Sequence, residues 1–320
     1  MADINLQDVH DTLVAIAFEA GSKILAADPN NIPKGTKLNS VDLVTEADQA
    51  VERLVSTKLR EKYPDFDFVG EETYVAGETR VTDAPTFVVD PIDGTTNFVH
   101  GFPHACISLG FAVGRQPAVG VVYNPFLDTL YSAVQGGGAF MQRNASLARD
   151  DSIDSSLRSR ISSRQQLPLV GRGDSASAPP LHGLGTALVA VEWGSDRQGA
   201  NFDIKVETYR RLAAATEPNT PNAMVHSLRS LGSAALNLCA VATGQLDAYW
   251  EGGCYAWDVC AAWCILTEAG GIMASGNSGC WDPALDSRVY LAVRGAPAGQ
   301  RAIVEELWGV LGDSKIVYKH

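Results

Sequence analysis

The three- and four-residue spacing of apolar side chains predicts two amphipathic helices near the start of the chain. The second helix runs from about Thr45 to Tyr63 and ends at Pro64. Two short strands are expected after it, at residues 66–69 and 87–89, and the second is a continuous apolar run that ends at Asp90. Asn5 stands where its side chain can cap the N-terminus of the first helix. The apolar positions of that helix are Leu6, Val9, Leu13, Ala17, Ala20 and Ile24.

Between residues 105 and 141 apolar and polar residues alternate, which is the period of a half-buried strand. Turn-forming residues interrupt the alternation at 114–117, 124–125 and 136–138. This pattern predicts an antiparallel meander, and therefore an α+β organisation for the first half of the chain.

The second half alternates predicted strands and helices, which indicates an α/β organisation. Strands are expected at 187–192, 246–250 and 289–293, and helices at 231–243, 256–269 and 300–311. Residues 144–183 are rich in Ser, Arg, Asp, Gly and Pro, which is typical of a surface excursion with room for a strand inside it. We therefore expect an N-terminal half at 1–143, a variable linker at 144–182 and a C-terminal half at 183–320.

Composition narrows the classes of protein that this chain can be. With 320 residues and 46% hydrophobic content it can bury a sizeable core. It has no long uncharged apolar run and no secretory signal, so we expect a cytoplasmic protein that does not bind a membrane. A formal charge of -12 repels a nucleic-acid backbone and argues against that partner. The six cysteines form no CxxC pair and are interpreted as reduced thiols.

The segment Asp90-Pro91-Ile92-Asp93-Gly94-Thr95-Thr96-Asn97 carries the most specific chemistry. Its proline and glycine favour a bend between a strand and a helix, so both carboxylates can face one point. The bend frees the Ile92 carbonyl as a ligand, and the amides of Gly94 and Thr95 can hold a phosphate at the start of the helix. Such oxygen donors suit Mg²⁺ and not Zn²⁺. Alternatively, two aspartates in a turn simply cap a helix.

Two further acidic positions strengthen the metal interpretation. Glu71 lies in Gly70-Glu71-Glu72, directly after a predicted strand. The alternative is that these two glutamates lie on the surface and are solvated. Asp258 lies in Trp257-Asp258-Val259, at the start of a helix without other charges in its first turns. The alternative to a metal role is that Asp258 simply caps this helix. Neither position decides the matter alone.

Taken together, these segments resemble the inositol monophosphatase family. Gly70-Glu71-Glu72, the segment from Asp90 to Phe98, and Trp257-Asp258-Val259 occur in the family's order, and nearly the whole chain fits. The resemblance implies an α/β fold, an alternating α-β-α-β-α sandwich of the sugar and inositol phosphatase type. It also implies a homodimer that binds two or three Mg²⁺ ions and is inhibited by lithium.

The resemblance further assigns metal ligands in this chain. Glu71, Asp90 and the Ile92 carbonyl would hold the first ion, and Asp90, Asp93 and Asp258 the second. Glu71 would also touch a third ion.

Catalytic and substrate roles follow from the same resemblance. Thr95, hydrogen-bonded to Asp48, would position and deprotonate the attacking water, so Glu71, Thr95 and Asp48 are the expected catalytic residues. Glu251 would accept hydrogen bonds from vicinal hydroxyls, although it could also be an exposed glutamate at a strand end. Lys37 corresponds to a family lysine near the third metal. The expected substrate contacts are Asp93, Gly94, Thr95, Ala234, Glu251 and Asp258.

The expected function is Mg²⁺-dependent hydrolysis of myo-inositol monophosphate to myo-inositol and phosphate. The small phosphorylated polyol is the expected partner. Alternatives are a related phosphatase for a sugar phosphate or a nucleotide 3'-phosphate, and a metal-binding regulator without catalysis.

Overall fold

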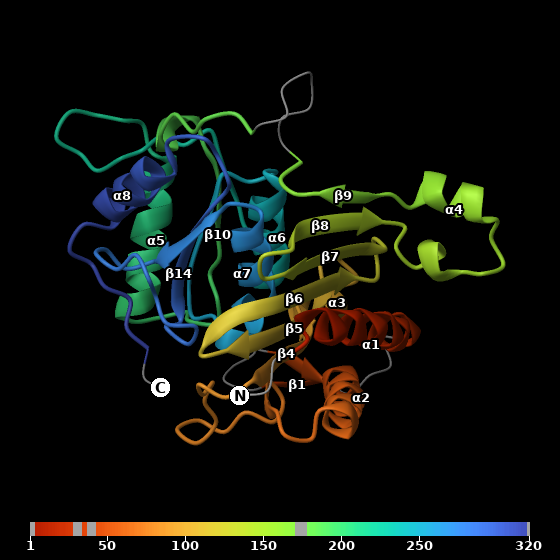
Figure 1. The fold of residues 1–320 in the computed structure, drawn as a ribbon. Helices are drawn as coiled ribbons and strands as arrows, with labels where there is room; N and C mark the ends of the chain where they lie inside the picture. The colour runs from red at the N-terminus through yellow and green to blue at the C-terminus, as the bar shows by residue number, and fades with distance from the viewer. Residues whose placement is uncertain (1–3, 28–33, 37–42, 170–177, 319–320) are drawn as a thin grey trace.

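A computed structural model describes residues 4–27, 34–36, 43–169 and 178–318. For residues 34–36 and 43–45 it describes the backbone alone. The chain forms five layers in the order helix, sheet, helix, sheet, helix (Figure 1). This confirms the predicted α/β fold class and its layered sandwich. Among the described residues no helix combines the length and apolarity that a membrane crossing requires.

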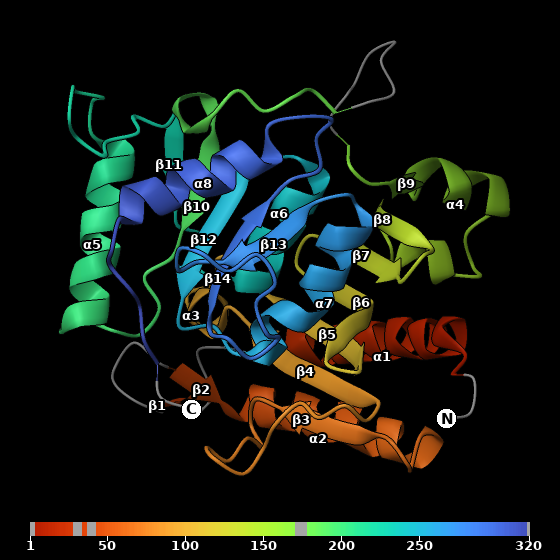
Figure 2. The same cartoon turned by 60° about the vertical axis from the view of Figure 1, so that its left-hand side comes forward.

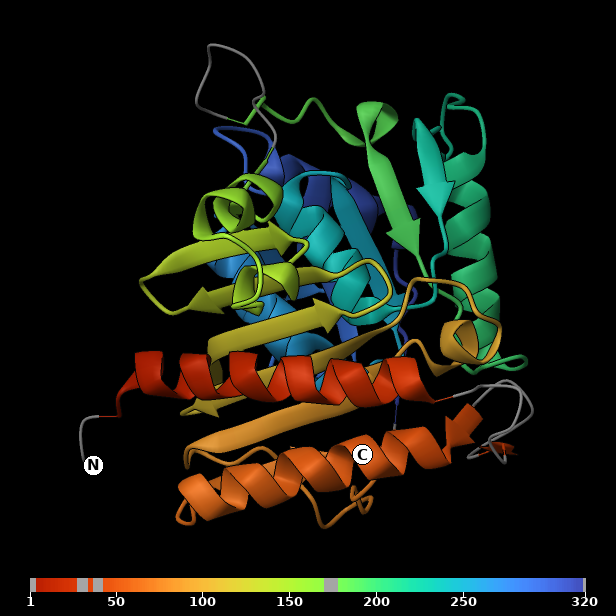
Figure 3. The same cartoon turned by 90° about the vertical axis from the view of Figure 1, so that its right-hand side faces the viewer.

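Two helices cover the outer face of the larger sheet. Helices α1 (Leu6–Ala26) and α2 (Glu46–Lys62) run side by side across it (Figure 3). Asn5 caps α1 by accepting a hydrogen bond from the Asp8 amide at 3.1 Å, as its position predicted. The apolar stripe of α1, including Leu13 and Ala17, is buried against the sheet, so both helix predictions are confirmed.

The larger sheet has seven strands in the order β3-β4-β5-β6-β7-β8-β9. The first two, β3 (Asp67–Gly70) and β4 (Thr86–Asp93), are parallel, and all later pairs are antiparallel. The predicted meander is confirmed as β5 (Cys106–Val113), β6 (Gln116–Asn124), β7 (Thr129–Val134) and β8 (Gly138–Arg143).

The excursion after residue 144 contains regular structure. It holds a short 3-10 helix η1 (Leu147–Arg149), helix α4 (Ser155–Ile161) and strand β9 (Arg164–Gln166), which pairs with β8 and extends the sheet. A second 3-10 helix, η2 (Leu184–Thr186), follows it. The division into two halves joined by a linker at 144–182 stays a prediction.

The middle layer consists of α6 (Ala234–Thr243) and α7 (Ala256–Glu268), which lie between the two sheets (Figure 2). Most of their residues are buried because sheets cover both faces, which explains why these helices lack a polar stripe. Glycines in the large sheet allow α7 to come close: a Cβ at Gly120 would lie 2.0 Å from the Ala261 carbonyl oxygen, and one at Gly110 would lie 2.6 Å from Cys260 Sγ.

The smaller sheet has five strands in the order β11-β10-β12-β14-β13. Strands β11 (Ser227–Arg229), β10 (Leu188–Val191) and β12 (Ala248–Gly252) are parallel, while β14 (Val289–Val293) and β13 (Ile272–Ser275) run antiparallel to their neighbours. Helices α5 (Ala200–Ala213) and α8 (Gln300–Leu311) form the last layer (Figure 2). Three of these elements, β11, β13 and α5, were not predicted.

Three short elements complete the described chain. Strands β1 (Lys34–Thr36) and β2 (Leu43–Thr45) form an antiparallel pair, so α2 begins one residue later than predicted. Helix α3 (Thr95–Val99) follows β4 directly, where the bend of the acidic segment predicted a helix start.

Candidate active site

Three carboxylates from distant parts of the sequence meet at one point. Asp90 and Asp93 end β4, and Asp258 lies in the first turn of α7. One oxygen from each lies within 4.8 Å of one oxygen from each of the others. Asp90 and Asp93 are buried and Asp258 is half-buried. The structure therefore brings together acidic residues that stand about 165 positions apart in the chain, as a shared metal site would require.

Glu71 joins this cluster from the neighbouring strand. It follows β3, which is parallel to β4, and its amide donates to the Val89 carbonyl at 3.1 Å. Because parallel strands end at the same edge of a sheet, Glu71 reaches the same side as Asp90. Its negative charge contributes to the raised pKa of both Asp90 and Asp258, so the four carboxylates act on one another.

The electrostatics of the cluster call for a cation. Burial raises the pKa of Asp90 well above its usual range, and the charges of Glu71, Asp93 and Asp258 raise it further. Burial also raises the pKa of Asp93 to about 6, against the effect of hydrogen bonds from Ser233 and from α6. A divalent cation would remove this repulsion and satisfy the buried oxygens. The donor set fits Mg²⁺, which prefers carboxylate and carbonyl oxygens.

The bend after Asp93 depends on glycine. Gly94 has φ of 92°, in the left-handed region, and a Cβ there would lie 2.9 Å from the His104 carbonyl oxygen and 3.1 Å from that of Gly232. Within the bend, the Ile92 amide donates to Asp90 Oδ1 at 3.0 Å, which fixes the carboxylate beside the turn.

Thr95 and Asp48 are also brought together. Thr95 Oγ1 lies 3.2 Å from Asp48 Oδ1 and 3.0 Å from the Ile92 carbonyl oxygen. Asp48 is buried in the first turn of α2, one of the two helices on the outer face of the larger sheet. The threonine hydroxyl has one proton and two acceptors in reach, so its orientation depends on which acceptor is otherwise engaged.

Asp93 is anchored by the start of α6. Its carboxylate accepts hydrogen bonds from Ser233 Oγ at 2.5 Å, from the Ala235 amide at 2.8 Å and from the Ala234 amide at 3.3 Å. The segment before α6 is tied to the motif by Asn97, whose Nδ2 donates to the carbonyl oxygens of His104 and Leu231, each at 2.7 Å. Ala234, an expected substrate contact, therefore lies directly beside Asp93.

Glu251 lies at the end of β12 and is buried, not exposed. Tyr249 donates its hydroxyl proton to Glu251 Oε2. Burial and the negative charge of Glu192 raise the pKa of Glu251 to about 7. The exposed-glutamate alternative is therefore wrong for this residue, since its carboxylate lies inside the protein.

Sequence reasoning missed Glu192. It follows β10, beside β12, in the register that pairs Val191 with Trp250. Its Oε1 accepts hydrogen bonds from the amides of Leu231 and Gly232, at 2.6 and 2.9 Å, and from Asn237 Nδ2 at 2.8 Å. Glu192 therefore holds the loop that presents Ser233 and Ala234 to Asp93. The signal was present: a carboxylate ends a predicted apolar strand, as Asp90 does.

Asp258 caps its helix as well as facing the cluster. Its Oδ2 accepts a hydrogen bond from the Tyr255 amide at 2.6 Å. The capping interpretation and the metal interpretation are therefore compatible, because the second carboxylate oxygen is not needed for the cap. Lys37, named from the sequence, lies outside the described residues.

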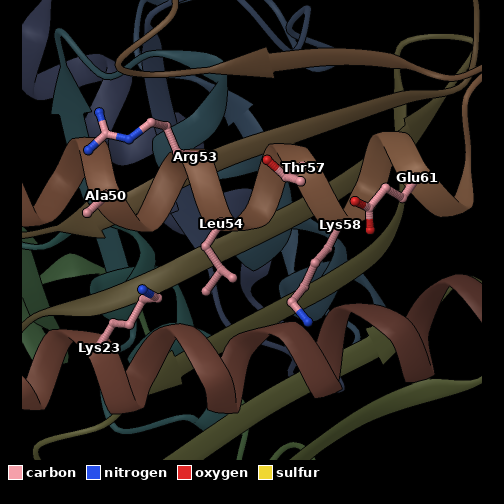
Figure 4. A pocket seen from close by; sticks show the side chains of 7 residues that line it. All are labelled: Lys23, Ala50, Arg53, Leu54, Thr57, Lys58 and Glu61. Atoms are coloured by element: carbon pink, nitrogen blue, oxygen red, sulfur yellow. The ribbon is translucent and has the colours of Figure 1, made fainter.

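A groove of about 450 Å³ between α1 and α2 lies apart from this cluster (Figure 4). Leu54 and Lys58 of α2 and Lys23 of α1 face one another across it. Glu61 is the single carboxylate among its lining residues, so the groove lacks the donors that would hold a divalent cation.

Comparison with known proteins agrees with this geometry. The chain is 49% identical over 311 residues to inositol monophosphatase 2 of Saccharomyces cerevisiae, covering 95% of this chain and 94% of that protein. It is 44% identical to inositol monophosphatase 1 of the same yeast, covering 91% of this chain and 90% of that protein.

A solved structure shows the same fold. The crystal structure of the extragenic suppressor protein suhB from Bartonella henselae matches with a TM-score of 0.71 and 25% identity, covering 95% of this chain and 98% of that one. The sequence model of the inositol monophosphatase family matches residues 5–311, and the chain therefore belongs to the inositol monophosphatase family, whose members are phosphoric monoester hydrolases.

Proposed function

We propose that this protein hydrolyses myo-inositol monophosphate to myo-inositol and phosphate, with Mg²⁺ as its cofactor. The observation that carries the proposal is the buried convergence of Asp90, Asp93 and Asp258 in a member of the inositol monophosphatase family. A sugar phosphate or a nucleotide 3'-phosphate presents the same ester chemistry, so the residues around the alcohol part of the substrate decide between them.

The convergence of Asp90, Asp93 and Asp258 supports the proposed set of metal ligands. Glu71, Asp90 and the Ile92 carbonyl would hold one Mg²⁺, and Asp90, Asp93 and Asp258 a second, with Glu71 also touching a third. When bound, such ions lower the pKa of a coordinated water and stabilise the charge on the leaving alkoxide. The carboxylates that now repel one another would then each face positive charge.

Thr95 and Asp48 would handle the proton of the attacking water. If the Ile92 carbonyl is engaged by a metal, the Thr95 hydroxyl donates to Asp48 Oδ1, which lies 3.2 Å away. The lone pairs of Thr95 Oγ1 are then free to accept a hydrogen bond from the water. Thr95 thereby orients the nucleophile, and Asp48 is the final acceptor of its proton.

The alcohol part of the substrate would lie between Asp93, Ala234 and Glu251. The phosphate would rest on the amides of Gly94 and Thr95, at the start of the turn that leads into α3. Glu251 is a buried acceptor at a strand end, and a carboxylate can accept hydrogen bonds from two neighbouring hydroxyls. An acceptor of this kind beside the alcohol part would favour a polyol over an aryl ester.

We further propose that the protein works in the cytoplasm as a homodimer. The support is the family to which it belongs and the absence of a helix long and apolar enough to cross a membrane among the described residues. Sedimentation of the purified full chain would give its assembly state, and a mass equal to one chain would contradict the dimer.

The test is phosphate release from a panel of esters with Mg²⁺. We expect the highest kcat/KM on inositol monophosphates, lower values on sugar phosphates and on a nucleotide 3'-phosphate, and loss of turnover after chelation that Mg²⁺ restores and Zn²⁺ does not. Asp90→Asn serves as the matched inactive protein, since it removes a ligand charge with little change in shape. A clear preference for another ester would refute the inositol assignment, and full activity after chelation would refute the metal assignment.

A further inference from the structure

The end of the described chain returns to the end of β12, where Glu251 lies. Residues 316–318, here termed the C-terminal segment, are held by two asparagines. Asn277 donates to the Ile316 carbonyl oxygen at 2.8 Å and accepts from the Ile316 amide at 2.9 Å. Asn201 makes the same pair with Val317, at 2.9 and 3.1 Å. Chain ends are usually poorly ordered unless tied down, and here four hydrogen bonds fix two residues.

The C-terminal segment packs on the residues that follow Glu251. Ile316 is buried, and a Cβ at Gly252 would lie 2.9 Å from its Cδ1. A Cβ at Gly253, which has φ of 118°, would lie 3.1 Å from Tyr318 Oη. The segment therefore occupies the space that side chains at positions 252 and 253 would otherwise fill. The backbone immediately after Glu251 cannot shift toward the segment without a clash.

Tyr318 also contacts an ion pair between a buried lysine and a half-buried aspartate. Its hydroxyl donates to Asp196 Oδ2 at 2.5 Å. The same oxygen lies 3.3 Å from Lys205 Nζ, and the Lys205 side chain is fully buried. Lys205 also donates to the Trp193 carbonyl oxygen at 3.0 Å. These contacts place a buried positive charge next to the ends of β10 and β12. The Lys205 charge opposes the rise in the pKa of Glu251 that burial and Glu192 cause.

Arg288 connects the segment to the metal side. Its guanidinium lies 4.6 Å from the centre of the Tyr318 ring and 3.6 Å from that of Tyr255. Arg288 Nη2 donates to the Gly253 carbonyl oxygen at 2.8 Å, and the Gly253 amide donates to the Arg288 carbonyl oxygen at 2.7 Å. The connection from Glu251 to Asp258 is therefore held from outside by Arg288 and the C-terminal segment.

We propose that the C-terminal segment, through the hydroxyl of Tyr318, positions Glu251 and thereby sets the preference of the site for polyol esters. Tyr318 is assigned as a positioning residue, because its hydroxyl contacts Asp196 and the Gly252 carbonyl oxygen. The inference rests on the proposed function, because it concerns the alcohol end of that site. Loosening residues 252 and 253 should let Glu251 leave the geometry that vicinal hydroxyls require, while the ester and its metal ligands stay in place.

Three full-chain or near-full-chain proteins test this. Tyr318→Phe keeps the ring over Arg288 and removes the hydroxyl that lies 2.5 Å from Asp196 Oδ2 and 3.1 Å from the Gly252 carbonyl oxygen. Val317→Ala, at a residue that is 68% exposed, is the matched control in the same segment. A chain that ends at Lys315 removes the segment altogether. Each is assayed with inositol monophosphate and with an aryl phosphate, and the amide hydrogen exchange of residues 252–255 is measured in parallel.

For Tyr318→Phe we expect KM for inositol monophosphate to rise by roughly threefold to tenfold, with kcat and the aryl phosphate kinetics within about twofold of wild type. Exchange at residues 252 and 253 should become faster. Val317→Ala should change neither the KM for inositol monophosphate nor the exchange rate. The chain ending at Lys315 should show a larger rise in this KM and faster exchange than Tyr318→Phe. Equal losses on the two esters, or unchanged KM and exchange in Tyr318→Phe, would overturn the inference. If wild type itself releases no phosphate from inositol monophosphate, the proposed function fails, and unchanged exchange still overturns the positioning role.

Discussion

Asp258→Asn gives the sharpest test of the proposed metal site, because Asp258 is the proposed ligand farthest in sequence from the others. The substitution removes one negative charge and keeps a side-chain oxygen that can accept the hydrogen bond from the Tyr255 amide, now 2.6 Å long. Since the cap is retained, α7 should lose about 1 kcal/mol or less. Any larger effect must come from the cluster and not from the helix.

The magnitude follows from the spacing of the carboxylates. Oxygens no more than 4.8 Å apart repel by roughly 3 kcal/mol for each ionised pair at an effective dielectric constant of about 20. Burial raises the pKa of Asp90 and of Asp258 well above the usual range, and this repulsion raises both further. Burial also raises the pKa of Asp93 to about 6. The metal-free protein therefore reduces the repulsion by keeping protons on the cluster.

The raised pKa values determine the sign of the pH dependence of stability. A carboxyl group whose pKa is raised by folding stabilises the protein at low pH, and this contribution is lost as pH rises through the folded-state pKa. Metal-free wild type should therefore lose stability as pH rises from about 4 through 6 and beyond. Metal-free Asp258→Asn should lose less over that range and be at least as stable as wild type above pH 7.

Mg²⁺ should reverse this order. An ion at 100 times its Kd stabilises the folded state by about 2.7 kcal/mol, which raises the thermal midpoint of a chain of this size by on the order of 5 °C. Asp258→Asn should gain much less, need more Mg²⁺ and lose orders of magnitude in kcat. The measurements are thermal unfolding from pH 4 to 8 with and without Mg²⁺, and phosphate release. A lower metal-free midpoint with kcat nearly intact would show that Asp258 is only a cap.

Three further predictions concern the rest of the site. Glu251→Gln should raise KM for a polyol phosphate more than for an aryl phosphate, and it should remove any change in the wild-type KM near pH 7, where the Glu251 carboxyl group titrates; equal losses on both esters would show a structural role. Glu192→Gln should lower kcat and raise the Mg²⁺ requirement by about tenfold, because the loop that anchors Asp93 loosens. The control is Glu268→Gln, because Glu268 likewise accepts hydrogen bonds from two backbone amides, those of Gly136 and Gly138, far from the cluster. This control should leave turnover unchanged, and an equal loss of kcat in the two variants would show that Glu192 has only a structural role. Lithium should inhibit at elevated concentration by occupying the second metal position, and unaltered turnover at saturating substrate would contradict that expectation.

Much of the fold and the site could be predicted because the signals are local. Helices α1 and α8 have an apolar stripe at helical spacing, and β14 is a short apolar run between turns, so their bounds agree with the prediction to within two residues. The acidic segment from Asp90 to Thr95 likewise carries its own bend, because Gly94 supplies the left-handed turn wherever the chain goes next.

Other elements were missed because their pattern is weak or shared. Strand β13 is four residues long and follows the paired glycines at the end of α7, so it has too few residues to show a period. Helix α5 buries Lys205, Thr208 and Leu212, a stripe in which two of three residues are polar, and a hydrophobic pattern cannot reveal it.

The sequence by itself determined which residues are proposed to carry the chemistry: carboxylates at strand ends, a glycine that bends the chain and a threonine beside it. Only the tertiary structure decided which of them meet. Glu192 reaches the loop before α6, and Tyr318 reaches the end of β12, because packed layers bring segments together that are more than 35 and 60 residues apart. Such contacts depend on how layers stack, and hydrogen bonds between stacked layers leave no periodic trace in the chain, since each needs only one donor and one acceptor at the right place.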